Sequence, residues 1–186
     1  MSITTKEKAV KQIIAVFREY GYEGTSLSLL SKATGLGRSS LYHHFPKGKE
    51  DMAAAALEAV LVSFDTMVFT PLRQKKQTPF QRLNTCAKGL SLFYANGERS
   101  CLINIFSVGA AGKLFQVPLE ESTLAMINMF SNLAKEAGIP GKIARHRAEE
   151  LVISIQGALV LSRTLHSKSL FNRLVKELPG RFLEVD

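Results

Sequence analysis

The sequence contains few cysteines, and this limits the kinds of protein that it can encode. Its 186 residues include only Cys86 and Cys101. Two cysteines are too few for a disulfide framework or a four-cysteine zinc site, and these two do not form a CxxC pair. We expect two reduced thiols in the core and neither a metal nor another cofactor; a redox-sensing role for Cys101 is the alternative.

Patterns that direct a chain to a membrane or into a β-sheet are also missing. Residues 1–8 are polar and lack the apolar core of a signal peptide. We find no apolar run that approaches membrane-spanning length, and no segment with the two-residue period of a strand. These absences predict a helical, cytoplasmic protein that does not contact a membrane.

No group of residues is typical of a catalytic site. His43 and His44 are neighbours in a basic segment, and neither His146 nor His166 belongs to a set with metal-ligand spacing. The sequence lacks a phosphate-binding glycine loop, a GxSxG motif and an HExxH motif. We therefore predict that the protein is not an enzyme.

Basic residues outnumber acidic ones, but unevenly along the chain. The net charge is +8, which suits a nucleic-acid partner. Residues 1–60 hold eight basic and six acidic side chains, which leaves only +2 there. Residues 25–48 contain no acidic residue at all, so the local field favours a polyanion. Attachment to a membrane surface is the alternative explanation of the overall charge.

Residues 25–45 predict two short helices joined by a tight turn. Thr25 and Ser26 can cap the first helix, whose apolar residues recur at three-residue spacing. Gly35 can adopt the positive φ that ends a helix. In the second helix, Leu41 and Phe45 lie four residues apart on one face. This layout is typical of a DNA-reading helix-turn-helix; a simple αα-hairpin with solvated polar residues is the alternative.

The polar residues of the second short helix are suited to bases and phosphates. Arg38 can donate two hydrogen bonds to guanine, and Ser39 or Ser40 can pair with either member of a base pair. Tyr42 and Lys49 are candidate phosphate anchors. His43 and His44 also point away from the apolar face, which adds further donors and acceptors.

Four motifs follow one another in this part of the chain: Gly21-Tyr-Glu-Gly-Thr-Ser26, Ala33-Thr-Gly-Leu36, Leu41-Tyr-His-His-Phe45 and Lys49-Glu-Asp-Met52. In this order and spacing they resemble the N-terminal domain of the TetR/AcrR family of ligand-responsive repressors. The resemblance covers about a third of the chain. It implies that Thr25 starts a helix that touches phosphate, and that Arg38 to Ser40 open the recognition helix.

The same resemblance places Tyr42, His44 and Lys49 at phosphate-contacting positions. One position departs from the family pattern, because the family often has an aromatic residue where this chain has His43. An aromatic contact there is therefore not carried over. The predicted DNA-binding residues are Thr25, Arg38, Ser39, Ser40, Tyr42, His43, His44 and Lys49.

The remaining sequence also predicts helices. One runs from Thr4 to Gly21, and a long one runs from Lys49 to about Phe69, without glycine or proline. The long helix begins in the DNA-binding part and ends beyond it, so we expect it to link the two parts mechanically. Thr78-Pro79 has the pattern of a helix start. Later helices are predicted at 79–96, 100–109, 118–137, 141–166 and 168–178, with breaks at Gly97, Gly112, Gly138 to Pro140, and Pro179-Gly180.

The C-terminal part has an apolar interior rich in Met and Phe, whose side chains can adapt to a bound molecule. Asn104 and Gln156 interrupt apolar runs, and burying an amide without a partner costs about 1–3 kcal/mol. A small-molecule effector, a backbone carbonyl or a water molecule can supply that partner. The predicted effector-binding residues are Asn104, Phe106, Met126, Phe130 and Gln156, and a plain helical core is the alternative for each.

Residues 151–161 are nearly all apolar, so their helix must be covered from more than one side. Gly157-Ala158 would permit another helix to approach closely. Together with the last helix, this one can form a four-helix seam between two subunits, which is the arrangement that the family resemblance implies. The predicted interface residues are Ala158, Leu161, Leu170, Phe171 and Leu174; burial within one chain is the alternative.

These predictions combine into an all-α protein with two domains. Residues 3–63 form a three-helix DNA-binding domain with its helix-turn-helix at 26–45, and residues 64–186 form a helical ligand-binding and dimerisation domain. We predict a homodimeric repressor that a small apolar or amphipathic molecule releases from double-stranded operator DNA. Ser100-Cys-Leu-Ile-Asn104 and Gln156-Gly-Ala158 are similar to the LmrA/YxaF-like branch of the family. The alternative is a helical small-molecule carrier or protein-interaction adaptor without specific DNA binding.

Overall fold

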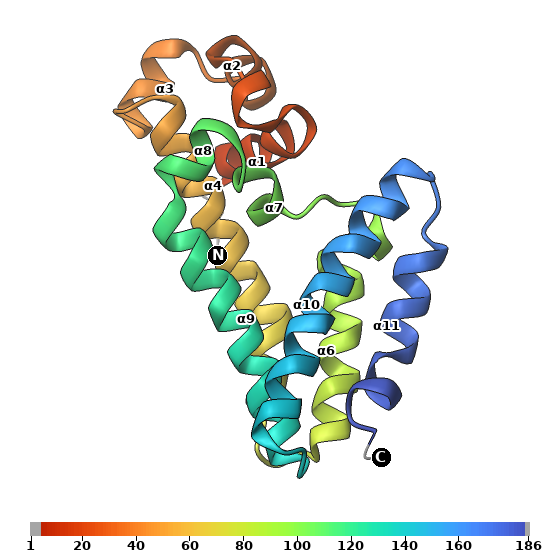
Figure 1. The fold of residues 1–186 in the computed structure, drawn as a ribbon. Coiled ribbons are helices and arrows are strands. Elements are labelled where there is room, and N and C mark those ends of the chain that lie inside the picture. The colour runs from red at the N-terminus through yellow and green to blue at the C-terminus, as the bar shows by residue number, and fades with distance from the viewer. Residues whose placement is uncertain (1–4, 185–186) are drawn as a thin grey trace. The chain divides into compact units, whose positions relative to one another are not determined.

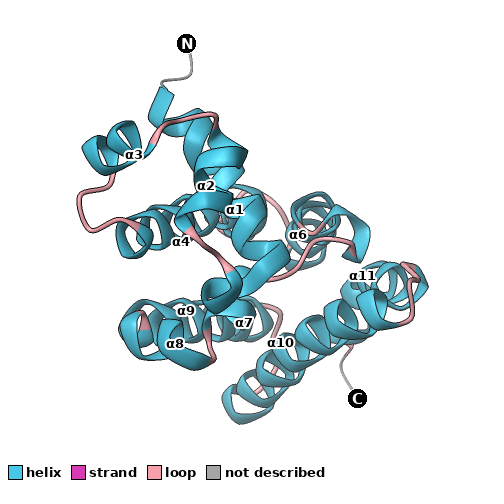
Figure 2. Ribbon diagram, turned by 90° about the horizontal axis from the view of Figure 1, so that it is seen from above, coloured by secondary structure: helices cyan, strands magenta, loops and turns pink. Residues whose placement is uncertain are grey.

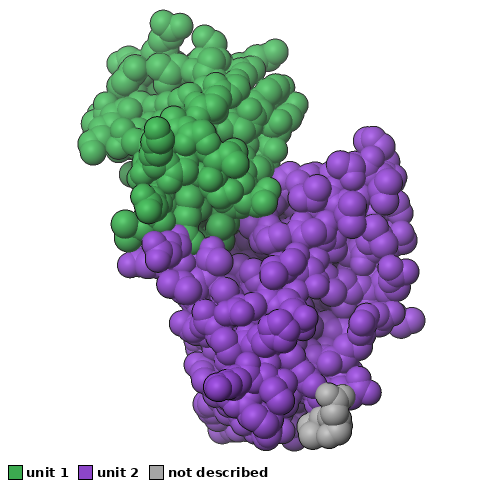
Figure 3. All heavy atoms as spheres, in the orientation of Figure 1, with its two compact units in different colours: residues 1–62, 102–119 green, residues 63–101, 120–186 purple. Residues whose placement is uncertain are grey.

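The computed structural model describes residues 5–184, and every regular element in that range is a helix (Figure 2). The predicted all-α fold is thus confirmed. Contacts divide the chain into two compact units (Figure 3). Unit 1 contains the residues up to 62 and Leu102–Leu119, and unit 2 contains Ser63–Cys101 and the residues from 120 onward. Residues 3, 4, 185 and 186, which we assigned to the two predicted domains, lie outside the described residues.

Unit 1 consists of the N-terminal helices, up to residue 62, and a short segment from the middle of the chain, Leu102–Leu119. Its core contains large side chains that are almost completely buried, among them Ile13, Phe17, Leu30 and Met52. Its elements, shown in Figure 1, are α1 (Thr5–Gly24), α2 (Leu27–Thr34), α3 (Arg38–His44), most of α4 (Lys49–Phe64), α7 (Leu102–Phe106), α8 (Gly109–Leu114) and the start of α9 (Gln116–Glu136).

Local interactions fix the turn between α2 and α3. The Ser26 hydroxyl caps α2 by accepting a 3.2 Å hydrogen bond from the Leu29 N–H. Gly35 ends the helix at a φ of 69°, a conformation that favours glycine. The Ser31 hydroxyl then donates to the Leu36 carbonyl at 2.7 Å. These three interactions all lie within residues 26–36.

Residues 102–114 differ from the single helix that we expected at 100–109. The chain instead forms two short helices, α7 and α8, on either side of a turn. Gly109 adopts a φ of 64° at the start of α8, which interrupts a continuous helix. Gly112, which we expected to be a break, lies inside α8, where a Cβ would come within 2.8 Å of the Ser107 carbonyl oxygen.

The regular elements of unit 2, up to residue 184, are also all helices. Its α6 begins with a capping box, in which Thr78 and Gln81 each accept a hydrogen bond from the other's backbone N–H, at 3.2 and 3.0 Å. This confirms the predicted start at Thr78-Pro79. The elements of unit 2 are the π-helix η1 (Asp65–Phe69), α5 (Thr70–Leu72), α6 (Pro79–Phe93), the 3₁₀-helix η2 (Ala95–Gly97), most of α9, α10 (Gly141–Thr164) and α11 (Ser169–Phe182).

The predicted long helix after Lys49 exists but changes its geometry along its length. It is α-helical to Phe64, π-helical from Asp65 to Phe69, and α-helical again to Leu72. Our prediction that no apolar run approaches membrane-spanning length is wrong, because Lys49–Leu72 is long and apolar enough by length and composition. Of its most apolar stretch, 44% is buried inside the protein. Core helices of soluble proteins meet the same criterion.

The end of α11 also differs from our prediction. We expected Pro179-Gly180 to end this helix, yet it continues to Phe182 with the proline inside it. Proline in a helix interior normally breaks a hydrogen bond. Here Pro179 and Phe182 are buried, and the Phe182 ring packs 5.9 Å from the Phe130 ring, so burial of the last turn offsets that loss.

A buried arginine joins three segments of unit 2. Arg82 is only 3% exposed, and it donates to the Leu72 carbonyl at 2.8 Å and to Glu136 at 2.5 Å. Lys75 also pairs with Glu136. Hydrogen bonds from Lys75 and Arg82 lower the pKa of the Glu136 carboxyl below its ordinary value. The ends of α5 and α9 are thus held against α6.

The close approach of α6 to η1 predicts a large effect for one small substitution. A Cβ on Gly89 would lie 1.9 Å from the Met67 carbonyl oxygen. Gly89→Ala should therefore lower the free energy of unfolding by about 1–3 kcal/mol. Gly180→Ala is the control in α11, because a Cβ there would meet none of the described residues within 4 Å; it should be neutral or stabilising by up to about 1 kcal/mol. Equal denaturation midpoints at equal protein concentration would contradict this packing.

Candidate nucleic-acid interface

The third helix presents one apolar face to the core and its polar residues to solvent. Leu41 and Phe45, which are 0% and 1% exposed, fix the orientation of α3 on unit 1. His44 is half-buried. The predicted contact residues on the outer side are all exposed: Arg38, Ser39, Ser40, Tyr42 and His43. The geometry therefore leaves these donors and acceptors accessible to a ligand as large as a duplex.

Glycine 48 positions the exposed ring of Tyr42. Gly48 adopts a φ of 63°, and a Cβ there would lie 3.2 Å from the Tyr42 Cε1 atom. The backbone of the turn before α4 thus packs directly against the ring, which remains 45% exposed. The sequence did not single out Gly48. The contact between Gly48 and Tyr42 becomes apparent only when the conformation of the turn is known, so the sequence alone could not have identified this glycine.

The charges around α3 are arranged in favour of an anion. Among residues 5–184, the Arg38 guanidinium has no hydrogen-bond or ion-pair partner. The nearest acids in sequence, Glu50 and Asp51, lie in the first turn of α4. Asp51 accepts a 2.7 Å hydrogen bond from the Lys47 backbone N–H, and Glu50 lies 3.9 Å from the exposed Lys47 ammonium. Both acids therefore interact within their own turn, and neither pairs with Arg38.

Thr25 has a different local role from the helix start that we expected. Ser26, not Thr25, caps α2. The Thr25 side chain is only 2% exposed, and its hydroxyl donates to the Gly21 carbonyl at 2.5 Å. Its hydroxyl proton is therefore committed to the end of α1. A phosphate contact by Thr25 stays a prediction.

Lys49 binds the end of α1. Its ammonium donates to the carbonyls of Tyr22 and Thr25, at 3.0 and 3.1 Å, and lies 4.3 Å from the centre of the Tyr22 ring. Two of its three N–H bonds are thus used within unit 1. A phosphate contact by Lys49 stays a prediction. Sequence reasoning missed Tyr22 as the residue that positions this lysine, since nothing local indicated that α1 and α4 meet there.

The predicted effector residues are divided between the two units. Asn104 and Phe106 belong to unit 1, whereas Met126, Phe130 and Gln156 belong to unit 2. Asn104 is exposed, so the buried amide on which its prediction rested is not present. The short helix α7 turns it outward, because Leu102 and Phe106 occupy the buried face.

Within unit 2, the three remaining effector candidates differ in accessibility. Met126 and Phe130 are 2% and 0% exposed, so they are core residues in this conformation. Gln156 is half-buried, and its side-chain amide donates to the Cys101 sulfur at 3.5 Å. The hydrogen-bond partner that we expected for this amide is therefore a thiol. Cys86 and Cys101 are both buried free thiols, as expected.

The outer surface of α10 and α11 carries most of the predicted dimer residues. Leu161 is 48% exposed, and Ala158, Leu170 and Leu174 are half-buried. Phe171 is different, because its ring is completely buried and lies 5.8 Å from the Tyr94 ring. It offers no exposed surface to a partner. The sequence did not single out Ile153 and Leu165, which are 69% and 61% exposed on and directly after α10.

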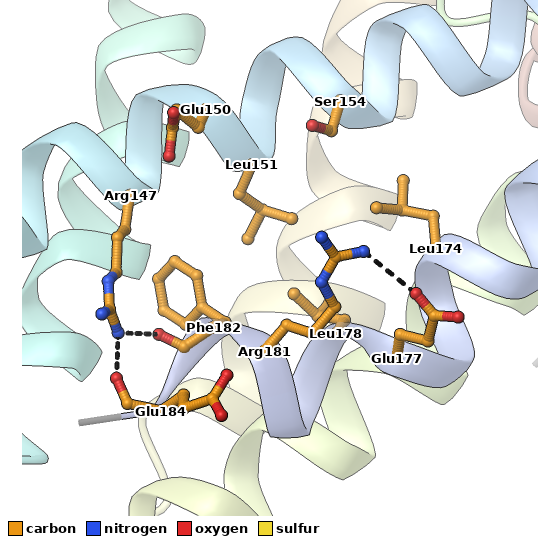
Figure 4. Close-up of a pocket in the computed structure, with 10 residues that line it drawn as sticks. All are labelled: Arg147, Glu150, Leu151, Ser154, Leu174, Glu177, Leu178, Arg181, Phe182 and Glu184. Carbon is orange, nitrogen blue, oxygen red and sulfur yellow. Dashed lines mark hydrogen bonds and ion pairs between the residues drawn. The ribbon is translucent and has the colours of Figure 1, made fainter. Parts of the chain in front are cut away.

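A groove of about 270 Å³ lies between α10 and α11 (Figure 4). Leu151, Leu174 and Leu178 line it together with charged residues. Arg147 binds the backbone carbonyls of Phe182 and Glu184 at one end, and Arg181 pairs with Glu177 at 3.1 Å, as the dashed lines show. The groove thus combines an apolar floor with a charged rim, which is a common composition of protein–protein contact surfaces.

Comparison with known proteins agrees with this geometry. Residues 10–56 match the family model of "Bacterial regulatory proteins, tetR family". This match contains α2, α3 and the start of α4.

Among residues 5–184, no cluster of three or more potential metal ligands occurs.

Full-length relatives extend the similarity beyond this segment. The HTH-type transcriptional regulator LmrA of Bacillus subtilis is 24% identical over 164 residues, which cover 86% of this chain and 87% of that protein. The uncharacterized HTH-type transcriptional regulator YxaF of the same organism is 22% identical and covers 94% and 93%. A TetR transcriptional regulator from Legionella pneumophila has the same fold, with a TM-score of 0.83, 16% identity and 99% coverage of both chains. The expected similarity to LmrA and YxaF is confirmed.

Proposed function

Because residues 10–56 match the TetR family model and relatives along most of the chain are HTH-type transcriptional regulators, we propose that the chain is a dimeric TetR-family repressor that a small molecule releases from operator DNA. The observation that carries the DNA-binding part is the outer face of α3. There, five exposed polar residues stand on a helix fixed by Leu41 and Phe45. No acidic residue occurs from 25 to 48, so this face attracts the phosphate backbone.

Two kinds of contact follow from the residue types on this face. Arg38 is at the N-terminal end of α3, which is the end of a recognition helix that meets base edges in the major groove. Its guanidinium can donate two hydrogen bonds to guanine, and the serines beside it can donate or accept. Tyr42 lies farther along α3 and Lys49 begins α4, and contacts of these two residues to phosphate would fix the register of the helix on the duplex.

Arg38 provides the sharpest test of base reading. Arg38→Ala should weaken binding to the preferred site by about 1–3 kcal/mol and bring it closer to the affinity for unrelated DNA. Arg38→Lys is the matched control, because it keeps the charge but loses the planar pair of donors. It should keep the salt dependence of the wild type and still lose discrimination. Competition binding at several salt concentrations measures both properties.

Unchanged discrimination in both Arg38 variants would remove this residue from base reading. Ser39, Ser40 and His43 would then be the candidates for that role. The variants leave the core of unit 1 intact, since Arg38 is exposed and has no partner among the described residues. A general loss of folding is therefore not expected.

The dimer is proposed to form through the outer surface of α10 and α11. Three apolar residues on and directly after α10 are exposed, Ile153, Leu161 and Leu165, and Leu174 on α11 is half-buried. Removing such a surface from water is worth about 25 cal/mol per Å². The helix-turn-helix segments of the two subunits of a dimer also bind two half-sites together, which raises the affinity for DNA far above that of one subunit.

A charge on this surface should prevent association. Leu161→Glu should give a folded monomer, because the carboxylate would have to be buried without a partner at the interface. Leu92→Glu is the control, since this leucine is 71% exposed on α6, which is not part of the proposed surface. Light scattering measures the mass of each variant. A dimeric Leu161→Glu protein would place the interface elsewhere.

Release of DNA requires that the effector favour one conformation over another. A ligand shifts the equilibrium only by its difference in affinity for the DNA-competent and incompetent states. Two helices, α4 and α9, have residues in both units. We propose that they transmit the effect of an effector bound beside Gln156 to helices α1 to α3 of unit 1. A coupling of about 1–3 kcal/mol would lower operator affinity roughly 5- to 150-fold.

Linkage makes this proposal testable from both sides. The operator is first recovered by selection from genomic fragments, and substrates and products of the neighbouring gene product then serve as candidate effectors. Operator DNA should weaken binding of the active compound by the same factor by which that compound weakens operator binding. Gln156→Leu should reduce the response with little loss of DNA affinity, whereas Gln116→Leu, exposed at the start of α9, should not. Identical compound affinities with and without operator would rule out ligand-driven release.

A further inference from the structure

A segment from the middle of the sequence packs against the end of α1. Residues 102–119 belong to unit 1, although residues 63–101 separate them from the rest of that unit. The Glu23 carboxylate accepts a 2.6 Å hydrogen bond from the Ala110 N–H in the first turn of α8. Gly109 makes this approach possible, because a Cβ there would lie only 2.5 Å from the Glu23 Oε1 atom.

An aromatic cluster holds the same two segments together beside this hydrogen bond. The Tyr22 ring lies 6.1 Å from Phe106 and 6.3 Å from Phe115, and Phe106 lies 5.3 Å from Phe17. Phe17, Phe106 and Phe115 are buried. Packing of this kind supplies most of the attraction, while the directional bond to Glu23 sets the register of α8 on α1.

The end of α1 is also bound to the start of α4. Gly21 interrupts the helix with a φ of 67°, and the following residues form a last turn. In that turn, the carbonyls of Tyr22 and Thr25 accept from Lys49, and the Thr25 hydroxyl donates to Gly21. Residues 21–25 therefore contact both α8 and the start of α4.

We propose that Glu23 is a positioning residue for operator binding, which fixes the last turn of α1 and with it Thr25 and Lys49. This inference rests on the proposed function and adds the contact through which the rest of the chain influences the helix-turn-helix. The segment that carries Ala110 continues into unit 2 at both ends, at Cys101 and at Glu120. A rearrangement in unit 2 can therefore pull on this contact through the covalent chain.

The physical effect is one of preorganisation. Ordering a loose turn when DNA arrives costs entropy, and a turn that is already fixed avoids that cost. An exposed, charge-assisted hydrogen bond changes such an equilibrium by a small factor. Weakening the Glu23 contact should therefore lower operator affinity by about two- to fivefold, converted from about 0.5–1 kcal/mol.

The decisive experiment compares two isosteric substitutions that remove the same charge. Glu23→Gln removes the charge from the contact, and Glu58→Gln removes one from an exposed position on α4. Loss of a negative charge alone tightens binding to DNA, so Glu58→Gln should bind the selected operator as well as or slightly better than the wild type. Glu23→Gln should bind it about two- to fivefold more weakly, with a thermal midpoint equal to that of the control.

A second measurement follows the contact itself. Operator binding should slow hydrogen exchange in the peptide containing Ala110 in the wild type, and not in Glu23→Gln. Ala110→Pro, which removes the donor in the first turn of α8, should weaken operator binding, and adding Glu23→Gln should weaken it no further. Equal operator affinities of Glu23→Gln and Glu58→Gln would overturn the proposal. Failure of the wild type to bind any selected DNA would overturn the proposed function instead.

Discussion

Leu41 and Phe45 lie four residues apart, on α3 and at its C-terminal cap, and both are buried, which leaves Arg38, Ser39, Ser40, Tyr42 and His43 facing solvent. The helix has seven residues, so its position depends on this anchoring more than on its own stability. The Ser26 cap and the left-handed Gly35 bring the helix to the surface at a fixed angle. Accessibility of Arg38 to a duplex follows from these few contacts.

The end of α1 connects this surface to the rest of the chain. Lys49 uses two carbonyls of that turn, and Glu23 uses the first turn of α8. A residue predicted to contact phosphate thus also has a structural role, and both roles are compatible because an ammonium has three donors. The proposed repressor would therefore respond to events in unit 2 through α4, through α9 and through the contact at Glu23.

The parts of the fold that sequence reasoning found are those that local rules determine. The caps at Ser26 and Thr78 and the turn at Gly35 follow from residues within four positions of each other. The exposure of Asn104 depends on which face of α7 is buried in unit 1, and the break between α7 and α8 occurs at Gly109, whose positive φ the sequence alone does not reveal. Likewise, burial of Phe182 outweighed the helix-breaking signal of Pro179, and the sequence alone gives no weight to that burial.

Specific binding to DNA is the central claim, and its salt dependence tests it most directly. The affinity of the dimer for the selected operator and for a scrambled duplex is measured by fluorescence anisotropy across a range of salt concentrations. The account predicts a steep linear fall of the logarithm of affinity with the logarithm of salt for both duplexes, and an operator that binds at least about a thousandfold tighter. Equal affinity for the two duplexes, or no binding at low salt, would contradict it.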